Sequence, residues 1–336
     1  MKKFTELLIL SVLIMTANVC RAQNPAEQFM GMWTLDIEGG AVGWIGVHDD
    51  HGFIDADLLW RGGSVLPVSH VYFIDGKNMV ATRTREIVKQ KNNGEERKHV
   101  VTQIYEFQRN GKHLQGVMTA PAPNGMSVTK TKFAGWKLPD PPPAPDLSKV
   151  KYQNPVKLFN GKDLKDWSLV RPERVNGFEA VDGVMVNNPV QKGEKHIRYG
   201  NLRTNQEFYD FNLTIDVKVP EGSNSGIYLR GMYEVQILDS YGKDLDSHNM
   251  GAIYSRITPS VSAEKPAGEW QTLDITLCDR HVTVKLNGTT IIDNEPVYGP
   301  TGGAIIADVF KPGPIFLQGD HGKVSFRNIV LKPIIK

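Results

Sequence analysis

Apolar and polar residues alternate along most of the chain. Polar residues separate Trp33, Leu35 and Ile37, and residues 211–219 carry Phe, Leu, Ile or Val at every second position. A period of two residues is typical of a β-strand with one buried face, whereas the longer period of an amphipathic helix is nearly absent. The pattern therefore predicts an all-β protein.

Turn signals divide the N-terminal half, residues 26–137, into short predicted strands. The signals are Asp75-Gly76, Asn93-Gly94, Asn110-Gly111 and Asn124-Gly125. Such dipeptides favour tight hairpin loops, so we expect an antiparallel meander that forms a small barrel or sandwich. The opening Gly31-Met32-Trp33 resembles the Gly-x-Trp start of lipocalin-type barrels. A nearby group, Asp55, Asp57, Trp60 and Arg61, fits either a sugar site or the decoration of a strand end.

The clearest boundary in the chain is rich in proline. Five prolines fall within the eleven residues of LPDPPPAPDLS, where they remove backbone donors and hold the chain extended. We assign residues 138–150 as a linker between an N-terminal β domain (26–137) and a C-terminal domain (151–336). In the latter, alternating strands around Asp279-Arg280 and a hairpin signal at Asn287-Gly288 suit a two-sheet jelly roll.

Residues 1–22 have the composition of a secretory signal peptide. A basic start is followed by an apolar run at 7–15 and a small residue, Ala22, at the expected cleavage site. Val19 before Cys20 is bulky, which disfavours a lipoprotein. We therefore expect export to the periplasm or the exterior. No apolar run approaches the roughly 20 residues of a membrane-spanning helix.

The charge balance argues against a nucleic-acid partner. The chain has 39 basic and 37 acidic residues, and removal of the leader leaves it formally neutral. Nucleic-acid-binding proteins show a basic footprint instead. Cleavage also removes Cys20 and leaves Cys278 alone, so neither an intrachain disulfide nor a cysteine zinc site can form.

Several motifs of the C-terminal half occur in the order typical of one family. They are Leu158-Phe159-Asn160-Gly161-Lys162-Asp163-Leu164 with Trp167, Gly226-Ile227-Tyr228-Leu229-Arg230, Tyr233-Glu234-Val235-Gln236, Gly251-Ala252-Ile253-Tyr254, Phe316-Leu317-Gln318-Gly319-Asp320-His321-Gly322 and Phe326-Arg327-Asn328-Ile329. Together they resemble the 3-keto-disaccharide hydrolase family of exported bacterial proteins over about residues 154–334. The resemblance implies a concanavalin-like jelly roll, and the N-terminal half lies outside it.

The stretch SNSGIYLRGMYEVQILDSYG places charged and amide residues within a strand-like pattern. A three-residue hairpin loop at 231–233 would pair Arg230 with Glu234 and Tyr228 with Gln236. Alternation would then send the intervening apolar residues to the core and these four polar residues to the opposite face. They would line the concave side of a curved sheet, or else form an ordinary cross-strand ion pair on a solvated face.

Two further segments supply polar residues after apolar ones. Gln318, Asp320 and His321 follow an apolar strand, and Tyr254 follows Gly251 in another. His321 stands between Gly319 and Gly322, which allow a close approach of backbone and ligand. We therefore select His321 among the histidines, although a structural role would fit the same residue.

The family resemblance implies a substrate already oxidised at C3 of its sugar. A base removes the acidified C2 proton, the C1 aglycone leaves, and water adds to the unsaturated product. A conventional retaining glycosidase needs two carboxylates about 5 Å apart, and Gln236 stands where the related jelly-roll enzymes carry an aspartate. We assign His321, Glu234 and Arg230 as catalytic, with Arg230 lowering the pKa of Glu234. The predicted substrate-binding residues are Tyr228, Gln236, Gln318, Tyr254, Asp239, Asp320, His248 and His196.

No cofactor is certain from the sequence, and a divalent metal in place of Arg230 is a second possibility. Its ligands would come from His196, His248, Asp239, Glu234 and His321, but no close histidine pair marks such a site. The expected partner is a 3-keto sugar or glycoside, with no nucleic acid and no membrane span, and a homo-oligomer is left open. A non-catalytic lectin-like module and a structural surface component are the alternatives to an enzyme. The sequence leaves open the linkage, the aglycone, the end product and the role of the N-terminal domain, for which a covering role is preferred.

Overall fold

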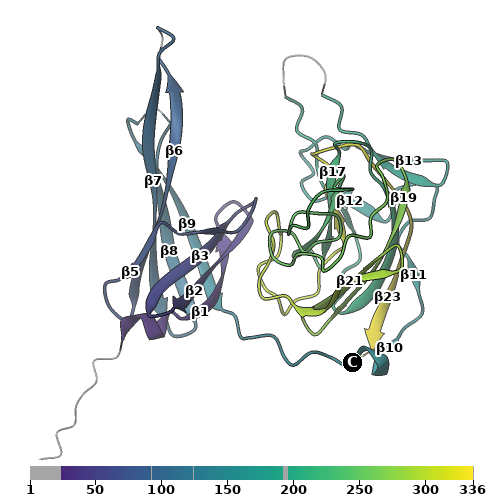
Figure 1. Cartoon of the computed structure of the whole chain (residues 1–336), viewed down its shortest axis with the longest axis horizontal. Helices are drawn as coiled ribbons and strands as arrows, with labels where there is room; N and C mark the ends of the chain where they lie inside the picture. The colour runs from purple at the N-terminus through teal and green to yellow at the C-terminus, as the bar shows by residue number, and fades with distance from the viewer. Residues whose placement is uncertain (1–23, 92, 124, 192–195, 336) are drawn as a thin grey trace, which may run out of the picture.

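The computed structural model describes residues 24–335 apart from 92, 124 and 192–195. The predicted signal peptide lies outside these residues. Two β-rich bodies follow one another along the chain (Figure 1), and the all-β prediction is confirmed. The only helices among the described residues are two short 3-10 turns, η1 (Pro25–Gln28) and η2 (Leu147–Lys149). No helix in the described part of the chain has the length and apolar character needed to cross a membrane.

The N-terminal body is one antiparallel sheet in the order β4-β3-β2-β1-β9-β8-β7-β6-β5. Its strands are β1 (Gly31–Ile37), β2 (Ala41–Asp50), β3 (Phe53–Trp60), β4 (Leu66–Pro67), β5 (His70–Phe73), β6 (Asn78–Gln90), β7 (Glu96–Asn110), β8 (His113–Pro121) and β9 (Val128–Lys137). The edge strands β4 and β5 are nearly consecutive in the chain, and β3 contacts β5. The sheet therefore curls back on itself around a buried apolar cluster that includes Trp33, Tyr105 and Phe133.

Two sheets form the C-terminal body. The larger runs β13-β14-β23-β16-β19-β20-β21, with β10 and β11 also paired to β23, and the smaller runs β12-β15-β22-β17-β18. The strands are β10 (Lys151–Tyr152), β11 (Val156–Lys157), β12 (Trp167–Leu169), β13 (Phe178–Val181), β14 (Val184–Asn187), β15 (Leu202–Thr204), β16 (Phe211–Lys218), β17 (Asn224–Leu229), β18 (Tyr233–Leu238), β19 (Trp270–Cys278), β20 (His281–Leu286), β21 (Thr289–Pro296), β22 (Phe316–Leu317) and β23 (Val324–Ile335). This arrangement confirms the jelly-roll prediction.

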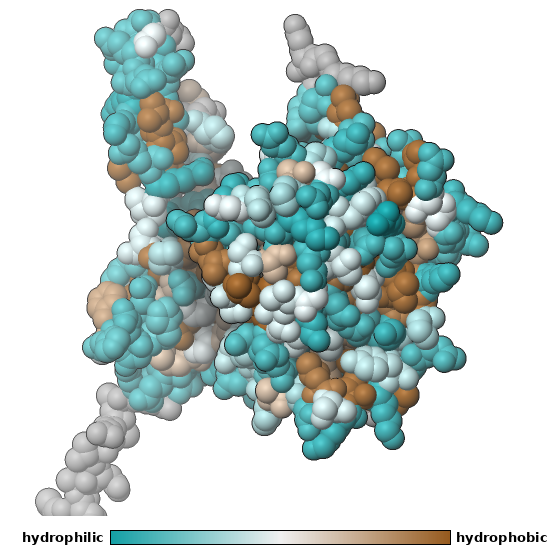
Figure 2. All heavy atoms as spheres, turned by 45° about the vertical axis from the view of Figure 1, so that its right-hand side comes forward, coloured by the Kyte–Doolittle hydropathy of each residue, from teal (hydrophilic) through white to brown (hydrophobic). Residues whose placement is uncertain are grey.

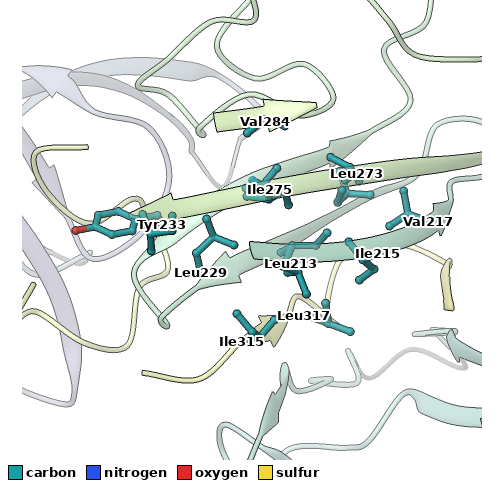
Figure 3. Close-up of a cluster of buried hydrophobic side chains, with 14 of the residues drawn as sticks. Leu213, Ile215, Val217, Leu229, Tyr233, Leu273, Ile275, Val284, Ile315 and Leu317 are labelled. Carbon is teal, nitrogen blue, oxygen red and sulfur yellow. The ribbon is translucent and has the colours of Figure 1, made fainter. Parts of the chain in front are cut away.

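The alternating apolar residues of the two sheets meet in a single core. Leu213, Ile215 and Val217 of β16 are fully buried, and they pack with Leu229 and Leu317 of the smaller sheet (Figure 3). Each buried aliphatic side chain stabilises the fold by about 1.5–3 kcal/mol relative to exposure. On the face of the molecule in Figure 2, hydrophilic residues cover most of the C-terminal body, as expected when its apolar residues lie inside.

The proline-rich segment after β9 lies against the C-terminal body. Leu138 joins the core of that body, and Arg280 donates a hydrogen bond from Nη1 to the carbonyl of Pro139 at 2.9 Å. Asn294 donates similarly to the carbonyl of Pro145 at 2.9 Å. Proline has no backbone donor, but its carbonyl still accepts hydrogen bonds. Hydrogen bonds at Pro139 and Pro145 therefore hold this segment against the C-terminal body.

The two bodies also contact each other directly. Thr34 Oγ1 donates to the carbonyl of Ala307 at 3.0 Å, and Trp44 Nε1 donates to the carbonyl of Pro300 at 2.8 Å. Val42 packs against Ala307 in a small apolar cluster. These contacts place the outer face of β1 and β2 against the 299–307 segment, which also borders the site described next.

Candidate active site

The β17–β18 hairpin turns one residue earlier than predicted. Its loop is Arg230-Gly231-Met232, so Tyr228 pairs with Glu234 and Leu229 with Tyr233. The predicted register, with Arg230 opposite Glu234, is therefore wrong. The observed register shifts each partner by two positions, so every side chain keeps the face that alternation predicts. Arg230 and Gly231 adopt positive φ values of 56° and 65°, which end the strand before the arginine can join it.

Arg230 does not contact Glu234. Its side chain is fully buried, with Nη2 2.6 Å from the carbonyl of Val309 and Nε 3.2 Å from that of Lys311. The guanidinium also lies 4.3 Å from the centroid of the Tyr209 ring. Arg230 therefore anchors the 309–311 segment, and its predicted effect on Glu234 is absent.

The polar face of the smaller sheet collects residues from three strands in two rows. Antiparallel pairing aligns Phe316, Tyr228 and Glu234 in one row, and the Phe316 and Tyr228 rings stack with centroids 3.8 Å apart. The next row contains Gln318 and Gln236 on either side of Gly226. The side-chain oxygens of both glutamines are buried and accept no hydrogen bond from the described residues. The structure thus brings together Tyr228, Glu234 and Gln236 as predicted from alternation, and Gln318, directly after β22, lies beside them.

Glu234 is a buried carboxyl group beside a tyrosine hydroxyl. Its side chain is 3% exposed, and its Oε2 lies 2.8 Å from Tyr228 Oη, which is also 2.7 Å from the carbonyl of Gly302. The tyrosine has a single proton, which it donates to the Gly302 carbonyl or, when Glu234 is ionised, to the carboxylate. Burial raises the pKa of Glu234 to about 8, while the Tyr228 hydrogen bond and the charge of His321 act in the opposite direction. The predicted low pKa of Glu234 is therefore wrong.

Gly226 makes room for this carboxyl group. A Cβ atom at position 226 would lie 2.2 Å from Glu234 Oε1 and 2.9 Å from Glu234 Cδ. Any larger residue would push the carboxyl group out of its place beside Tyr228. Glycine at position 226 therefore leaves space for the Glu234 carboxyl group, which extends from the neighbouring strand.

Asp320 and His321 form a half-exposed pair after β22. Asp320 Oδ1 lies 2.7 Å from His321 Nδ1, and each side chain is 48% exposed. The hydrogen bond from Asp320 raises the pKa of His321, burial opposes it, and the charges of Asp320 and Glu234 add to the increase. Burial raises the pKa of Asp320, but the His321 hydrogen bond and the charges of His321 and Arg174 together outweigh it and lower the pKa. With Nδ1 engaged, Nε2 is the ring nitrogen left to exchange protons.

Asp320 lines a cleft of about 1130 Å³ between the two bodies. The C-terminal wall includes Arg174, His196 and Asn201, and the N-terminal wall includes residues 38–41 and Arg61. Neither Glu234 nor His321 lines this cleft. Gly303 does, and a Cβ atom there would lie 2.6 Å from Tyr228 Oη. The glycine turn at 302–303 thus separates the Tyr228–Glu234 pair from the open space.

The other predicted binding residues lie elsewhere. His248 Nε2 is 2.9 Å from Ser64 Oγ of the N-terminal body, and its ring meets Tyr254 edge to face at 4.9 Å. Asp239 accepts a hydrogen bond from the backbone of Gly222 at 2.9 Å, at the opposite end of the hairpin from Arg230. His248 and Tyr254 therefore join the two bodies, and Asp239 holds a turn.

The predicted metal ligands do not gather in one place. Among the described residues, the acidic, histidine and cysteine side chains close enough to share an ion are Asp210, Cys278 and Asp279. None of them was a predicted ligand. A metal at Glu234, His321 or the other candidates stays a prediction.

Sequence analysis missed Arg174, Asn201 and Arg203 as lining residues of the cleft, and it named Arg61 only in a group that fits either a sugar site or a strand end. Arg203 lies between the buried Leu202 and Thr204, so alternation alone could have placed it on the polar face. Arg61 and Arg174 lie outside the strands, and no periodic signal marks them. Their position depends on how distant segments pack.

We expect Tyr228→Phe to raise the pKa of Glu234 above about 8, because the variant loses the hydrogen bond that stabilises the ionised carboxylate. The measurement is a pH titration of the Glu234 carboxyl carbon by NMR with ¹³C-labelled glutamate. Tyr72→Phe, at an exposed tyrosine of β5, is the matched control. An unchanged or lower pKa in Tyr228→Phe would contradict the role given to this hydroxyl.

The fold and the site together define a two-sheet jelly roll with a buried carboxyl group and an Asp–His pair whose aspartate lines a cleft. A family model described as the 3-keto-alpha-glucoside-1,2-lyase-like domain matches residues 154–332. The chain belongs to this family, which assigns it a carbohydrate-active role and confirms the resemblance found in its motifs. The match does not include the N-terminal body.

Solved structures show similar chains. One, from Parabacteroides distasonis ATCC 8503 and described as a putative glycosyl hydrolase, is 31% identical, with 57% of this chain and 93% of that chain covered and a TM-score of 0.44. Another from the same organism, with the same description, is 26% identical over 54% and 100%, with a TM-score of 0.40. A non-specific endo-beta-1,3(4)-glucanase of family GH16 is 13% identical over 59% and 96%, with a TM-score of 0.35. A search of curated proteins finds no match.

Proposed function

We propose that this protein cleaves 3-keto-glycosides by removing the C2 proton, eliminating the C1 aglycone and hydrating the product, after export from the cell. The family supports a glycoside substrate. One observation carries the proposal: an Asp–His pair whose aspartate lines a sugar-sized cleft is electrostatically coupled to a buried carboxyl group whose pKa is about 8. Groups with separately tuned pKa values are typical of acid–base catalysis.

His321 is the proposed base. A ketone at C3 makes the C2 hydrogen acidic, and the resulting enolate places negative charge on the C3 oxygen. Asp320 holds His321 Nδ1, so Nε2 takes the C2 proton and the imidazolium that forms is stabilised by the carboxylate. Since Arg230 is occupied elsewhere, Arg174 replaces it as the proposed cation for the enolate oxygen. Arg174 lines the cleft, and its charge lowers the pKa of Asp320.

Glu234 is the proposed acid. With a pKa of about 8 it is mostly protonated at neutral pH and can donate its proton to the departing C1 oxygen as the C1–O bond breaks. In the hydration step the carboxylate accepts a proton from water while hydroxide adds at C1, and His321 returns its proton to C2. The sum of the two steps is hydrolysis, and both catalytic groups regain their starting protonation.

This role requires Glu234 to reach the substrate. The turn Gly302-Gly303 stands between the Tyr228 hydroxyl and the cleft, and it has to move aside for direct contact. Once exposed, the unpaired side-chain oxygens of Gln236 and Gln318 in the neighbouring row would accept hydrogen bonds from sugar hydroxyls. The remaining predicted contacts, Tyr254, His248 and Asp239, are not needed for this arrangement.

The proposed reaction is tested with a chromogenic 3-keto-glucoside and the matching unoxidised glucoside, each with and without chelator. We expect consumption of the keto substrate only, because the unoxidised ring has no acidified C2 hydrogen. Cleavage of the unoxidised glucoside alone would establish a conventional glycosidase instead. Binding of either sugar without turnover would establish the lectin-like alternative, and loss of activity with chelator would add a metal to the mechanism.

A further inference from the structure

The cleft beside Asp320 is lined by an unusual set of cations. They are Arg61, Arg171, Arg174, Arg198 and Arg203. The chain contains 25 lysines and 14 arginines, yet none of the described lysines lines this cleft. The acidic residues on its walls are Glu38, Glu173 and Asp320, so the walls carry more positive than negative groups although the whole chain is close to neutral.

Most of this positive charge has no fixed partner among the described residues. Arg203 bonds Glu207 at 2.9 Å, while Arg174 lies 3.9 Å from Glu173. Within the part of the chain that the structure describes, the guanidinium groups of Arg171 and Arg198 make no hydrogen bond or ion pair, and Arg61 has only a long contact of 3.5 Å to Thr131 Oγ1. Three arginines are therefore available to a ligand.

Arginine rather than lysine indicates the kind of ligand. The guanidinium fork binds a carboxylate or sulfate through two parallel hydrogen bonds, whereas the ammonium group of lysine is a point charge. Like charges in one cleft repel one another, and an anion relieves that repulsion. A neutral glycoside offers nothing for these groups to neutralise.

We propose that the natural substrate is an anionic glycoside, carrying a carboxylate or sulfate away from the reacting ring, and that Arg61, Arg171 and Arg198 bind this group. The inference rests on the proposed 3-keto-glycoside reaction and names its substrate class. Asp320 and Arg174 line the same cleft, so an anchored anion would position the reacting ring beside the Asp–His pair.

The N-terminal body supplies part of this anion site. Arg61 directly follows β3 with a positive φ of 72°, and its carbonyl accepts a hydrogen bond from Gly303 of the C-terminal body at 3.2 Å. This contact holds the arginine at the cleft. Because the family match begins at residue 154, the selectivity for an anion is expected to be a property of the two-domain chain.

The test compares three chromogenic 3-keto-glucosides whose aglycones carry no charge, a carboxylate or a sulfate. We expect kcat/KM to be about tenfold or more higher for a charged substrate, mostly through KM, as charge-assisted hydrogen bonds allow. The two charged arms show which anion is preferred, and added salt should reduce the preference. Equal kcat/KM for all three would overturn the anion site while leaving the reaction intact.

Single variants show which arginines produce the preference for a charged substrate. Arg61→Gln, Arg171→Gln and Arg198→Gln should each raise KM for the charged substrate about tenfold and leave the neutral one unchanged, with melting curves to verify folding. Arg97→Gln, at an exposed arginine of β7, is the matched control and should change neither. If no keto substrate turns over, the anion site is tested separately by calorimetric binding of the unoxidised carboxylated glucoside. Weaker binding to the Arg61→Gln variant than to the wild type supports the anion site. Equal affinity of the wild type for the carboxylated and the neutral glucoside refutes it.

Discussion

Replacing Glu234 by glutamine should lower kcat on a 3-keto-glucoside by about 10²–10⁴-fold, the usual contribution of a general acid. Glutamine keeps the size of the side chain and the neutral state but has no proton to donate. In the wild type, activity should fall as pH rises through about 8, where Glu234 loses its proton. The variant should lack this alkaline limb. The measurement is kcat against pH for both proteins, with Glu179→Gln at an exposed position of β13 as the control.

The shape of the pH profile separates two roles for Glu234. An acid that contacts the substrate produces the alkaline limb, and its removal abolishes that limb. If Glu234 acts only through the charge that it presents to His321, its removal should instead shift the low-pH side of the profile, because that charge raises the pKa of His321. A Glu234→Gln variant with nearly full kcat would contradict both roles.

The same substitution should make stability less dependent on pH. The folded-state pKa of about 8 lies above the unfolded value, near 4.5. Between these values the unfolded chain loses a proton that the folded chain keeps, so the wild type becomes less stable as pH rises through this window. Glu234→Gln does not titrate, so its melting temperature relative to wild type should rise between pH 5 and pH 8. A constant difference would show that Glu234 has no raised pKa.

Replacing His321 by glutamine should have an effect of similar size, about 10²–10⁴-fold on kcat, because the proposed base is lost. Asp320→Asn should also lower kcat, since an amide can donate to Nδ1 and reverse the tautomer that leaves Nε2 free. It should in addition lower the pKa of His321, because the Asp320 hydrogen bond is the largest cause of its increase. The acidic limb of the profile then moves to lower pH.

The control for these two variants is His113→Gln, at an exposed histidine of β8. It should leave kcat, KM and the pH profile unchanged. If His321→Gln retains its kcat, His321 is not the base. If Asp320→Asn keeps full activity and the low-pH side of its kcat profile does not shift, Asp320 does not assist His321. Both side chains are about half exposed, so the variants are expected to fold.

Local pattern alone predicted much of the site. Tyr228, Glu234 and Gln236 share a face because successive side chains in a strand point to opposite sides, whatever the partner strand. The same rule sent Ile227, Leu229, Val235 and Ile237 to the core. The all-β fold and its jelly roll were likewise predicted, from alternation and from the order of the motifs.

The sequence by itself therefore determined the strands, their buried faces and the family, since these depend on neighbouring residues. Only the tertiary structure decided the register at Arg230, because two registers that differ by two residues preserve the same faces, and the positive φ values of the turn selected one of them. It also decided the pKa of Glu234, since desolvation depends on all the segments that cover a carboxyl group. Arg61 joins the cleft through a contact between residues more than two hundred positions apart, and no local pattern carries that information.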